Sequence, residues 1–160
     1  MRLRAATSLD RDLLTVLLAE AVTWAGHVRL SREQLLAQVQ TSNYVAEWKR
    51  PTDFGAVALT DDGEPVGAIW ARLFSRDAPG YGFIADDVPE LGLGVLPGWR
   101  GFGVGGLLLA AGIGQAQVRG WTALSLSVER ANVTAHRLYE RHEFAVVGRN
   151  GDSDTMLLDV

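Results

Sequence analysis

The sequence predicts an α/β domain in which one mixed sheet of about six to seven strands carries about four helices. Two observations support this fold class. Strand-like and helix-like apolar patterns alternate along the whole chain, and a glycine-rich turn joins the apolar stretch Leu91 to Val95 to a helical stretch that begins at Leu107. The chain has 160 residues, of which 48% are hydrophobic and 21% charged, so it is long enough to bury a core as a single domain, residues 1–160.

The first half is expected to contain a strand, two helices and a hairpin. Leu3 to Ala6 is the strand, and Ser8 is expected to cap a helix with leucines on one face. A capping box at Ser31 to Gln34 opens a second helix that is expected to continue through Val39. Two apolar runs around Asp61-Asp62-Gly63-Glu64 predict the hairpin, and they are Phe54 to Thr60 and Pro65 to Phe74.

The second half alternates strands with helices and ends in another hairpin. A strand from Glu90 to Val95 leads through the glycine-rich turn to a helix that ends near Arg119. A strand over Thr122 to Val128 and a helix over Val133 to His142 follow. Phe144 to Gly148 is expected to pair with Thr155 to Asp159 across Asn150-Gly151.

Composition excludes several classes of function. The chain has no cysteine, which excludes disulfides, thiolate metal sites and an acyl-cysteine intermediate. His136 and His142 lie six residues apart on one helix rather than three or four, so no metal site is expected. A net charge of −4 and a pI near 5.3 argue against nucleic acid and favour a cationic or amine partner. No signal peptide or membrane span is expected, so a cytoplasmic location is predicted.

Residues 99–106 read Trp-Arg-Gly-Phe-Gly-Val-Gly-Gly, and they predict a phosphate-binding turn. A glycine-rich turn at the start of a helix exposes backbone N–H groups at the positive end of the helix dipole. Two patterns fit this segment. Gly101, Gly103 and Gly106 spell G-x-G-x-x-G, with Glu129 in the place of a ribose-binding acid 23 residues further on. Arg100, Gly103 and Gly105 spell R-x-x-G-x-G, which resembles the pyrophosphate loop of the GCN5-related N-acetyltransferases, the GNAT family.

Spacing favours the acetyltransferase pattern. Five residues separate Val95 from Gly101, whereas a dinucleotide-binding turn follows its strand at once, and only 31 residues follow Glu129. A nicotinamide-dinucleotide-binding enzyme is therefore the distant alternative. Leu93 to Pro97 is similar to the family's V-x-P strand end. The family's closing segment N-x-x-A-x-x-L-Y-E-x-x-G-F is matched at Asn132, Ala135, Leu138, Tyr139, Glu140 and Phe144.

The resemblance covers residues 90–149 and has one departure. Glu143 stands where the family usually has glycine after the helix, and a left-handed conformation there would cost glutamate about 1 kcal/mol. The resemblance implies a GNAT-type, mostly antiparallel sheet whose fourth and fifth strands splay apart. It implies that the pantetheine arm of acetyl-CoA lies between those strands and bonds to the fourth as an added strand would.

The resemblance also assigns roles to residues. Tyr139 is expected to give a proton to the leaving thiolate, and a phenol with a pKa near 10 is protonated at neutral pH. Asn132 is expected both to cap its helix and to bond to the pantetheine amide. The backbone N–H groups from Phe102 to Gly106 are expected to hold the pyrophosphate, with charge from Arg100. The full set expected to bind coenzyme A is Leu93, Val95, Arg100, Gly101, Phe102, Gly103, Val104, Gly105, Gly106 and Asn132.

Glu90 is the candidate base that removes a proton from the acceptor amine, because it opens the fourth strand, where several family members keep a glutamate. Asp86 and Asp87, just before it, would draw in a cation, and Val95 at the far end of the strand is expected to meet the thioester. The alternative is a solvated turn, for which Asp-Asp-Val-Pro is a common composition. The two interpretations have equal weight.

Five aromatic or imidazole side chains could line the acceptor pocket or pack in the core, namely Trp24, His27, Trp48, Tyr81 and Phe83. His136, His142, Trp99 and Trp121 are expected to have no catalytic role.

The function expected is direct transfer of acetyl from acetyl-CoA to a primary amine of a small molecule or peptide, without metal. A non-catalytic acyl-CoA-binding sensor of the same fold is the alternative from another class. A homodimer is left open, and no nucleic acid or membrane partner is expected.

Overall fold

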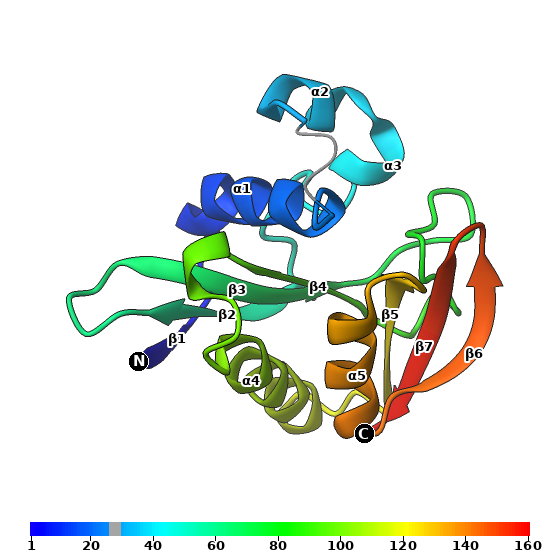
Figure 1. Ribbon diagram of the computed structural model, residues 1–160. Coiled ribbons are helices and arrows are strands. Elements are labelled where there is room, and N and C mark those ends of the chain that lie inside the picture. Colours follow the sequence, from blue (N-terminus) through cyan, green and yellow to red (C-terminus); the bar gives the residue numbers. More distant parts are fainter. Residues whose placement is uncertain (26–29) are drawn as a thin grey trace.

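A seven-stranded sheet separates two layers of helices in the computed structural model, which describes residues 1–25 and 30–160 (Figure 1). The strands are β1 (Arg2–Ala5), β2 (Phe54–Leu59), β3 (Pro65–Arg72), β4 (Glu90–Val95), β5 (Ala123–Glu129), β6 (Ala145–Asn150) and β7 (Ser153–Asp159). The helices of the described residues are α1 (Arg11–Val22), α2 (Arg32–Ala37), α3 (Val39–Ser42), α4 (Val104–Val118) and α5 (Val133–Arg141). Figure 1 shows α1 to α3 on one face of the sheet and α4 and α5 on the other.

The sheet is antiparallel except at one junction. Its order is β1-β2-β3-β4-β5-β7-β6, and β4 and β5 are the parallel pair. These two strands pair at one position, where Glu90, the first residue of β4, lies opposite Ser125, the third residue of β5, and the Ser125 N–H donates to the Pro89 carbonyl at 2.9 Å. Beyond that point they diverge, so the sheet opens into a V. The mostly antiparallel fold is confirmed, and the doubly wound parallel sheet of a nicotinamide enzyme is excluded.

Two core clusters, one on each face, hold the helices to the sheet. Alternate residues of β3 divide between them, with Ile69 and Ala71 in the cluster that includes α4, and Ala68 and Trp70 in the cluster that includes α1. Both clusters contain side chains that are almost completely buried. The cluster that includes α4 contains residues of β2, β3 and β4 as well as β5 and β7, so it holds the two sides of the V together on that face. No helix in the described part of the chain is long and apolar enough to cross a membrane.

The structure corrects four local expectations. Thr7, not Ser8, provides the N-terminal cap, and it opens a short 3-10 turn, Ser8–Asp10, before α1. The second helix does not continue through Val39, because Gln38 has extended angles (φ −89°, ψ 106°) that separate α2 from α3. This break gives five α-helices where about four were expected. Finally, α4 begins at Val104, one turn earlier than Leu107.

The end of α5 shows how the chain accommodates its departure from the family pattern. Glu143 has a φ of +69°, which is the left-handed conformation that glycine adopts without strain. The Phe144 N–H donates to the Tyr139 carbonyl at 3.1 Å and the Glu143 N–H to the Glu140 carbonyl at 3.0 Å. This is the Schellman pattern of hydrogen bonds. The helix therefore ends as it would with glycine, at a cost of about 1 kcal/mol in backbone strain.

Candidate active site

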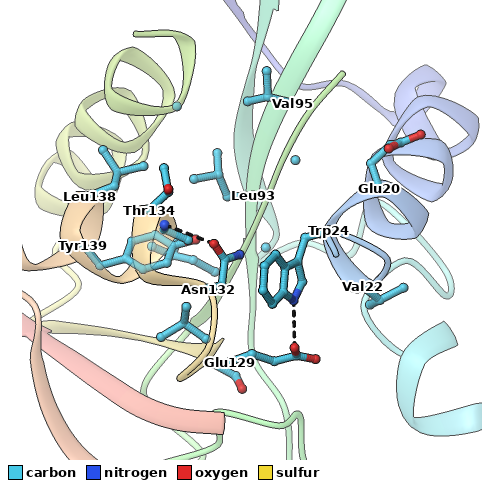
Figure 2. Close-up of a pocket in the computed structure, with 18 of the residues that line it drawn as sticks. Glu20, Val22, Trp24, Leu93, Val95, Glu129, Asn132, Thr134, Leu138 and Tyr139 are labelled. Atoms are coloured by element: carbon cyan, nitrogen blue, oxygen red, sulfur yellow. Dashed lines mark hydrogen bonds between the residues drawn. The ribbon is translucent and has the colours of Figure 1, made fainter. Parts of the chain in front are cut away.

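The opening between β4 and β5 is the mouth of a cleft of about 1100 Å³. Its walls come from β4, the glycine-rich loop, the start of α4, the last residues of β5, α5 and the end of α1. Figure 2 shows Leu93 and Val95 on β4 between Tyr139 and Asn132 on one side and Trp24 on the other. The cleft therefore places the two motifs that predicted a cofactor site, residues 90–106 and 132–144, against each other.

The glycine-rich loop lies at the Val95 end of β4. Gly101 and Gly103 have φ values of +81° and +83°, and the space where a Cβ would stand on either is open. Gly103 is the N-cap residue of α4, and no described side chain caps this helix end. Its first backbone N–H groups are thus available to an anion, and the helix dipole favours one there.

The expected cofactor residues of the loop differ in how they face the cleft. Gly101, Gly103, Val104, Gly105 and Gly106 line it. The Phe102 side chain is 74% exposed and contacts the Trp99 ring edge-on at 6.4 Å, so this residue can contribute only its backbone.

Arg100 lies at the edge of the loop with its guanidinium already engaged. Nε donates to the Val95 carbonyl at 3.1 Å, and Nη2 forms an ion pair with Glu20 of α1 at 3.2 Å. The side chain is 41% exposed. Neither contact uses Nη1, so the expected phosphate contact can be made through that nitrogen, whereas a contact through Nη2 would require exchange of Glu20 for phosphate.

The first turns of α5 bring Asn132 and Tyr139 into the cleft. The Asn132 side chain accepts a hydrogen bond from the Ala135 N–H at 3.3 Å, which confirms its expected role as helix cap. Tyr139 is half-buried, packs edge-on against Phe144 and makes no hydrogen bond through its hydroxyl to another described residue. Burial raises the pKa of Tyr139 to about 12, so this phenol keeps its proton at neutral pH.

Glu90 lies at the closed end of the V and is only 2% exposed. Its Oε2 accepts a hydrogen bond from the Tyr44 hydroxyl, and its Oε1 accepts one from the Gly82 N–H at 3.2 Å. Gly80 must be glycine for this arrangement, because a Cβ there would stand 2.3 Å from Oε1. The carboxylate is hydrogen-bonded, buried and part of the cleft wall. Glu90 is therefore not a residue of a solvated turn.

The environment of Glu90 raises the pH at which its carboxyl group ionises. Burial raises its pKa from 4.5 to about 7, against the opposing effect of the hydrogen bonds from Tyr44 and Gly82. A carboxylate with this pKa is a better proton acceptor near neutral pH than an ordinary surface glutamate. Asp86 and Asp87 are exposed and do not line the cleft, so their expected attraction of a cation would act from outside it.

Tyr44 is the site residue that the sequence interpretation missed. Its hydroxyl accepts the Tyr81 N–H at 2.9 Å while donating to Glu90, and its carbonyl accepts the Trp70 Nε1–H at 3.0 Å. Burial and the Glu90 carboxylate raise the pKa of Tyr44 well above its usual value, so the hydroxyl keeps its proton. Tyr44 is therefore a fixed hydrogen-bond donor to Glu90.

A buried arginine fixes the backbone around Tyr44. Arg72, which is fully buried on β3, donates from Nη1 to the carbonyls of Asn43 and Ala46 at 2.8 and 2.7 Å. Its Nη2 pairs with buried Asp53 at 2.5 Å. A buried arginine that is paired with a carboxylate and hydrogen-bonded to backbone carbonyls holds the segment that carries those carbonyls in place.

Of the side chains that could line the acceptor pocket, some lie in the cleft and others in the core. Trp24 and Tyr81 line the cleft, and Trp24 Nε1 donates to Glu129 Oε2 at 2.7 Å across its mouth (Figure 2). Trp48 is buried and donates to the Thr7 carbonyl at 2.9 Å, and Phe83 packs against the same core. Neither residue lines the cleft. His27 lies outside the described residues.

The remaining histidines have structural partners. His136 contacts Asp154 at 3.1 Å and Glu140 at 3.2 Å, and His142 Nδ1 contacts the Leu138 carbonyl at 3.0 Å. Among residues 1–25 and 30–160, no group of three or more His, Asp or Glu side chains is arranged to hold a metal ion.

Comparison with known proteins agrees with this geometry. A sequence model of the acetyltransferase (GNAT) family matches residues 24–144. Two curated relatives, both named mycothiol acetyltransferase, are those of Propionibacterium freudenreichii, 33% identical over 128 residues, and Paenarthrobacter aurescens, 31% identical over 114 residues. The alignments cover 79% and 69% of this chain but only 39% and 31% of those proteins, so the chain spans less than half the length of these relatives.

Solved structures share the fold over nearly the whole chain. The ribosomal-protein-alanine N-acetyltransferase from Brucella melitensis has a TM-score of 0.72 at 21% identity, with both chains fully covered. A phosphinothricin acetyltransferase from Sinorhizobium meliloti, in complex with AcCoA, has a TM-score of 0.70 at 20% identity, with 99% of this chain and 88% of that one covered. With the family match over residues 24–144 and this fold, the chain belongs to the GNAT family of N-acetyltransferases.

Proposed function

We propose that the protein transfers acetyl from acetyl-CoA directly to a primary amine. One observation carries the proposal: a single strand, β4, joins the uncapped N-terminus of α4 at one end of the cleft to the buried carboxylate of Glu90 at the other. The strand itself puts Glu90 and Val95 about 17 Å apart, and the glycine-rich loop follows beyond Val95. This arrangement suits a long ligand that has phosphates at one end and reacts at the other.

The residues present fit coenzyme A. Because β5 leaves β4 after Glu90, the edge of β4 from Leu91 to Val95 faces the cleft rather than a partner strand. An extended amide-containing arm would bond to that edge as an added strand, with Leu93, Val95 and Asn132 beside it. The loop from Gly101 to Gly106 would hold the pyrophosphate through its backbone N–H groups. This orientation puts phosphate near Val95 and the thioester nearer Glu90, the reverse of the sequence-based expectation that Val95 meets the thioester.

The proton transfers follow from the two side chains described above. Glu90, directly or through one water, takes a proton from the acceptor ammonium, and the freed amine forms the new C–N bond. The C–S bond breaks, and Tyr139 gives its proton to the departing sulfur. As the C–S bond breaks, the nitrogen loses its second proton, which passes through solvent to the Tyr139 phenolate and restores the phenol. Glu90 then releases its proton to solvent, so one proton is released for each acetyl group transferred. No metal or acyl-enzyme is required, in keeping with the absence of cysteine from the sequence.

Residues 1–160 are proposed to act as one acetyltransferase domain, and location in the cytoplasm stays a prediction. The curated relatives are named for mycothiol and one structural neighbour for a ribosomal-protein alanine. These names differ in acceptor, so they support transfer to an amine without choosing among amines.

The test is thiol release from acetyl-CoA by the purified chain with a panel of amines, amino-acid amides, aminoglycosides and N-terminal peptides. Release of thiol in equal amount to an acetylated amine, detected by mass spectrometry, is expected. Thermal stabilisation by coenzyme A but not by NAD is the accompanying binding result. Stabilisation by coenzyme A with no transfer to any amine would instead establish the acyl-CoA sensor, and stabilisation by NAD alone would establish the nicotinamide alternative.

A further inference from the structure

The face of the cleft on which Glu90 lies carries carboxylates and aromatic rings. On β5, Leu124, Leu126 and Val128 belong to the core cluster that includes α4, so Ser125, Ser127 and Glu129 point to the opposite face of the sheet. That is the face of Glu90, whose strand partner is Ser125. We call this wall the acceptor wall, and its members used below are Trp24, Tyr44, Tyr81, Glu90 and Glu129.

Glu129 stands at the mouth of the acceptor wall and Glu90 at its closed end. Glu129 is four positions along β5 from Ser125, the strand partner of Glu90, which is about 13 Å along the strand. Trp24 donates to Oε2 of Glu129, so the indole and the carboxylate face the cleft together while Oε1 has no described hydrogen-bond partner. Tyr81, which also lines the cleft, stacks on Tyr44 with 6.3 Å between the ring centroids.

In the part of the chain that the structure describes, the cations that line the cleft lie outside the acceptor wall. Among the described lining residues they are Arg100, in the glycine-rich loop, and Arg141, at the end of α5. Arg141 precedes His142, whose ring stands 4.0 Å from where a Gly106 Cβ would be, so it too belongs to the phosphate end. Arg130, next to Glu129, is bound to Asp154 and to the carbonyls of Gly151 and Ser153.

We infer that the acceptor is a primary amine with no free carboxylate beside its amino group, such as an amide, an amino sugar or a simple amine, and that Glu129 with Trp24 sets this selectivity. The inference rests on the proposed function. An approaching ammonium group is attracted by Glu129 and by the indole face, and then by Glu90. A carboxylate on the same carbon would lie against the partly desolvated acceptor wall. That wall carries the negative charges of Glu90 and Glu129 and no cation among the described residues, so desolvation and charge repulsion both disfavour the carboxylate.

The experiment compares L-alaninamide with L-alanine as acceptors for the wild type and two charge variants. Glu129→Lys reverses the charge at the mouth, and Asp62→Lys makes the same change on the exposed β2–β3 turn as the matched control. The measured quantity is the ratio of kcat/KM for the amide to that for the free acid. Division of the variant ratio by the wild-type ratio cancels the intrinsic reactivity of the two amines.

The wild type is expected to prefer the amide, and Glu129→Lys is expected to lower the ratio by about tenfold or more. Asp62→Lys should leave the ratio unchanged. Glu129 is exposed, so its replacement should not affect folding, and unchanged thermal stabilisation by coenzyme A checks this. Equal use of amide and acid by the wild type, or an unchanged ratio in Glu129→Lys, would overturn the inference while leaving amine acetylation intact. No transfer to any amine would overturn the proposed function itself.

Discussion

The buried carboxylate of Glu90 makes a quantitative prediction about pH. With a pKa of about 7, Glu90 is about one tenth ionised at pH 6 and about nine tenths ionised at pH 8. If the ionised form is the base, the catalysed rate should rise about tenfold across this interval. Glu90→Gln keeps the size of the side chain but has no ionisable group, so its rate should be low and should lack this dependence.

The assay is thiol release from acetyl-CoA, measured as kcat/KM for one amine from pH 6 to pH 8 with wild type and Glu90→Gln. The acceptor amine titrates identically in both series, so the ratio of wild-type to variant rates isolates Glu90. Glu64→Gln, on the exposed β2–β3 turn, makes the same chemical change outside the cleft and should behave as wild type. A wild-type to Glu90→Gln ratio that stays flat over these two pH units would refute the assignment of Glu90 as the base.

Stability provides an independent measurement of the same group. The folded-state pKa of Glu90, about 7, lies above the ordinary 4.5, so the folded state holds the proton more tightly than the unfolded chain. The free energy of unfolding should therefore fall as pH rises from about 4.5 to about 7, by on the order of 3 kcal/mol. Urea unfolding at pH 5 and pH 8 should show this fall in the wild type, and Glu90→Gln should lack this component.

Three further substitutions test the other parts of the cleft. Tyr139→Phe should fold and bind coenzyme A as wild type does but lose about 10²–10⁴-fold in turnover, and wild-type turnover would show that this hydroxyl is not the proton donor. Gly103→Val should weaken coenzyme A binding, measured by calorimetry. Its φ of +83° strains any side chain and the surrounding space is open, so the effect comes through the backbone; unchanged affinity in a folded variant would contradict the loop assignment. Tyr44→Phe removes a hydrogen bond that lowers the pKa of Glu90, so the acidic limb of the pH–rate profile should move to higher pH. An unchanged acidic limb would show that Tyr44 packs against Glu90 without affecting its pKa.

The parts of the site that lie close together in sequence could be predicted. The strand Glu90–Val95 has the predicted bounds. It is an apolar run, and Pro97 and the glycines that follow mark its end. The capping role of Asn132 follows from a local side-chain preference. Such features depend on spacing of a few residues, which a single sequence displays directly.

Contacts between distant segments could not be predicted. Tyr44 reaches Glu90 across 46 positions, and Trp24 reaches Glu129 across 105. One signal for the first contact was present, since Arg72 lies inside the otherwise apolar run Pro65 to Phe74. A charge in a buried strand requires a buried partner, and this requirement indicates a buried polar network beside the strand. The identity of that partner, Asp53, depends on the path of the loop between α3 and β2.

The pairing of Arg72 with Asp53 also bears on how Glu90 can serve as a base. Arg72 and Glu90 are directly opposite in the β3–β4 register, so their side chains leave the same face of the sheet. A guanidinium bound to Glu90 would hold the pKa of that carboxyl low and leave it a poor proton acceptor. Asp53 and two backbone carbonyls instead occupy the guanidinium, and Glu90 receives only neutral donors from Tyr44 and Gly82. The buried ion pair thus anchors the segment that carries Tyr44 and at the same time keeps its positive charge away from the proposed base.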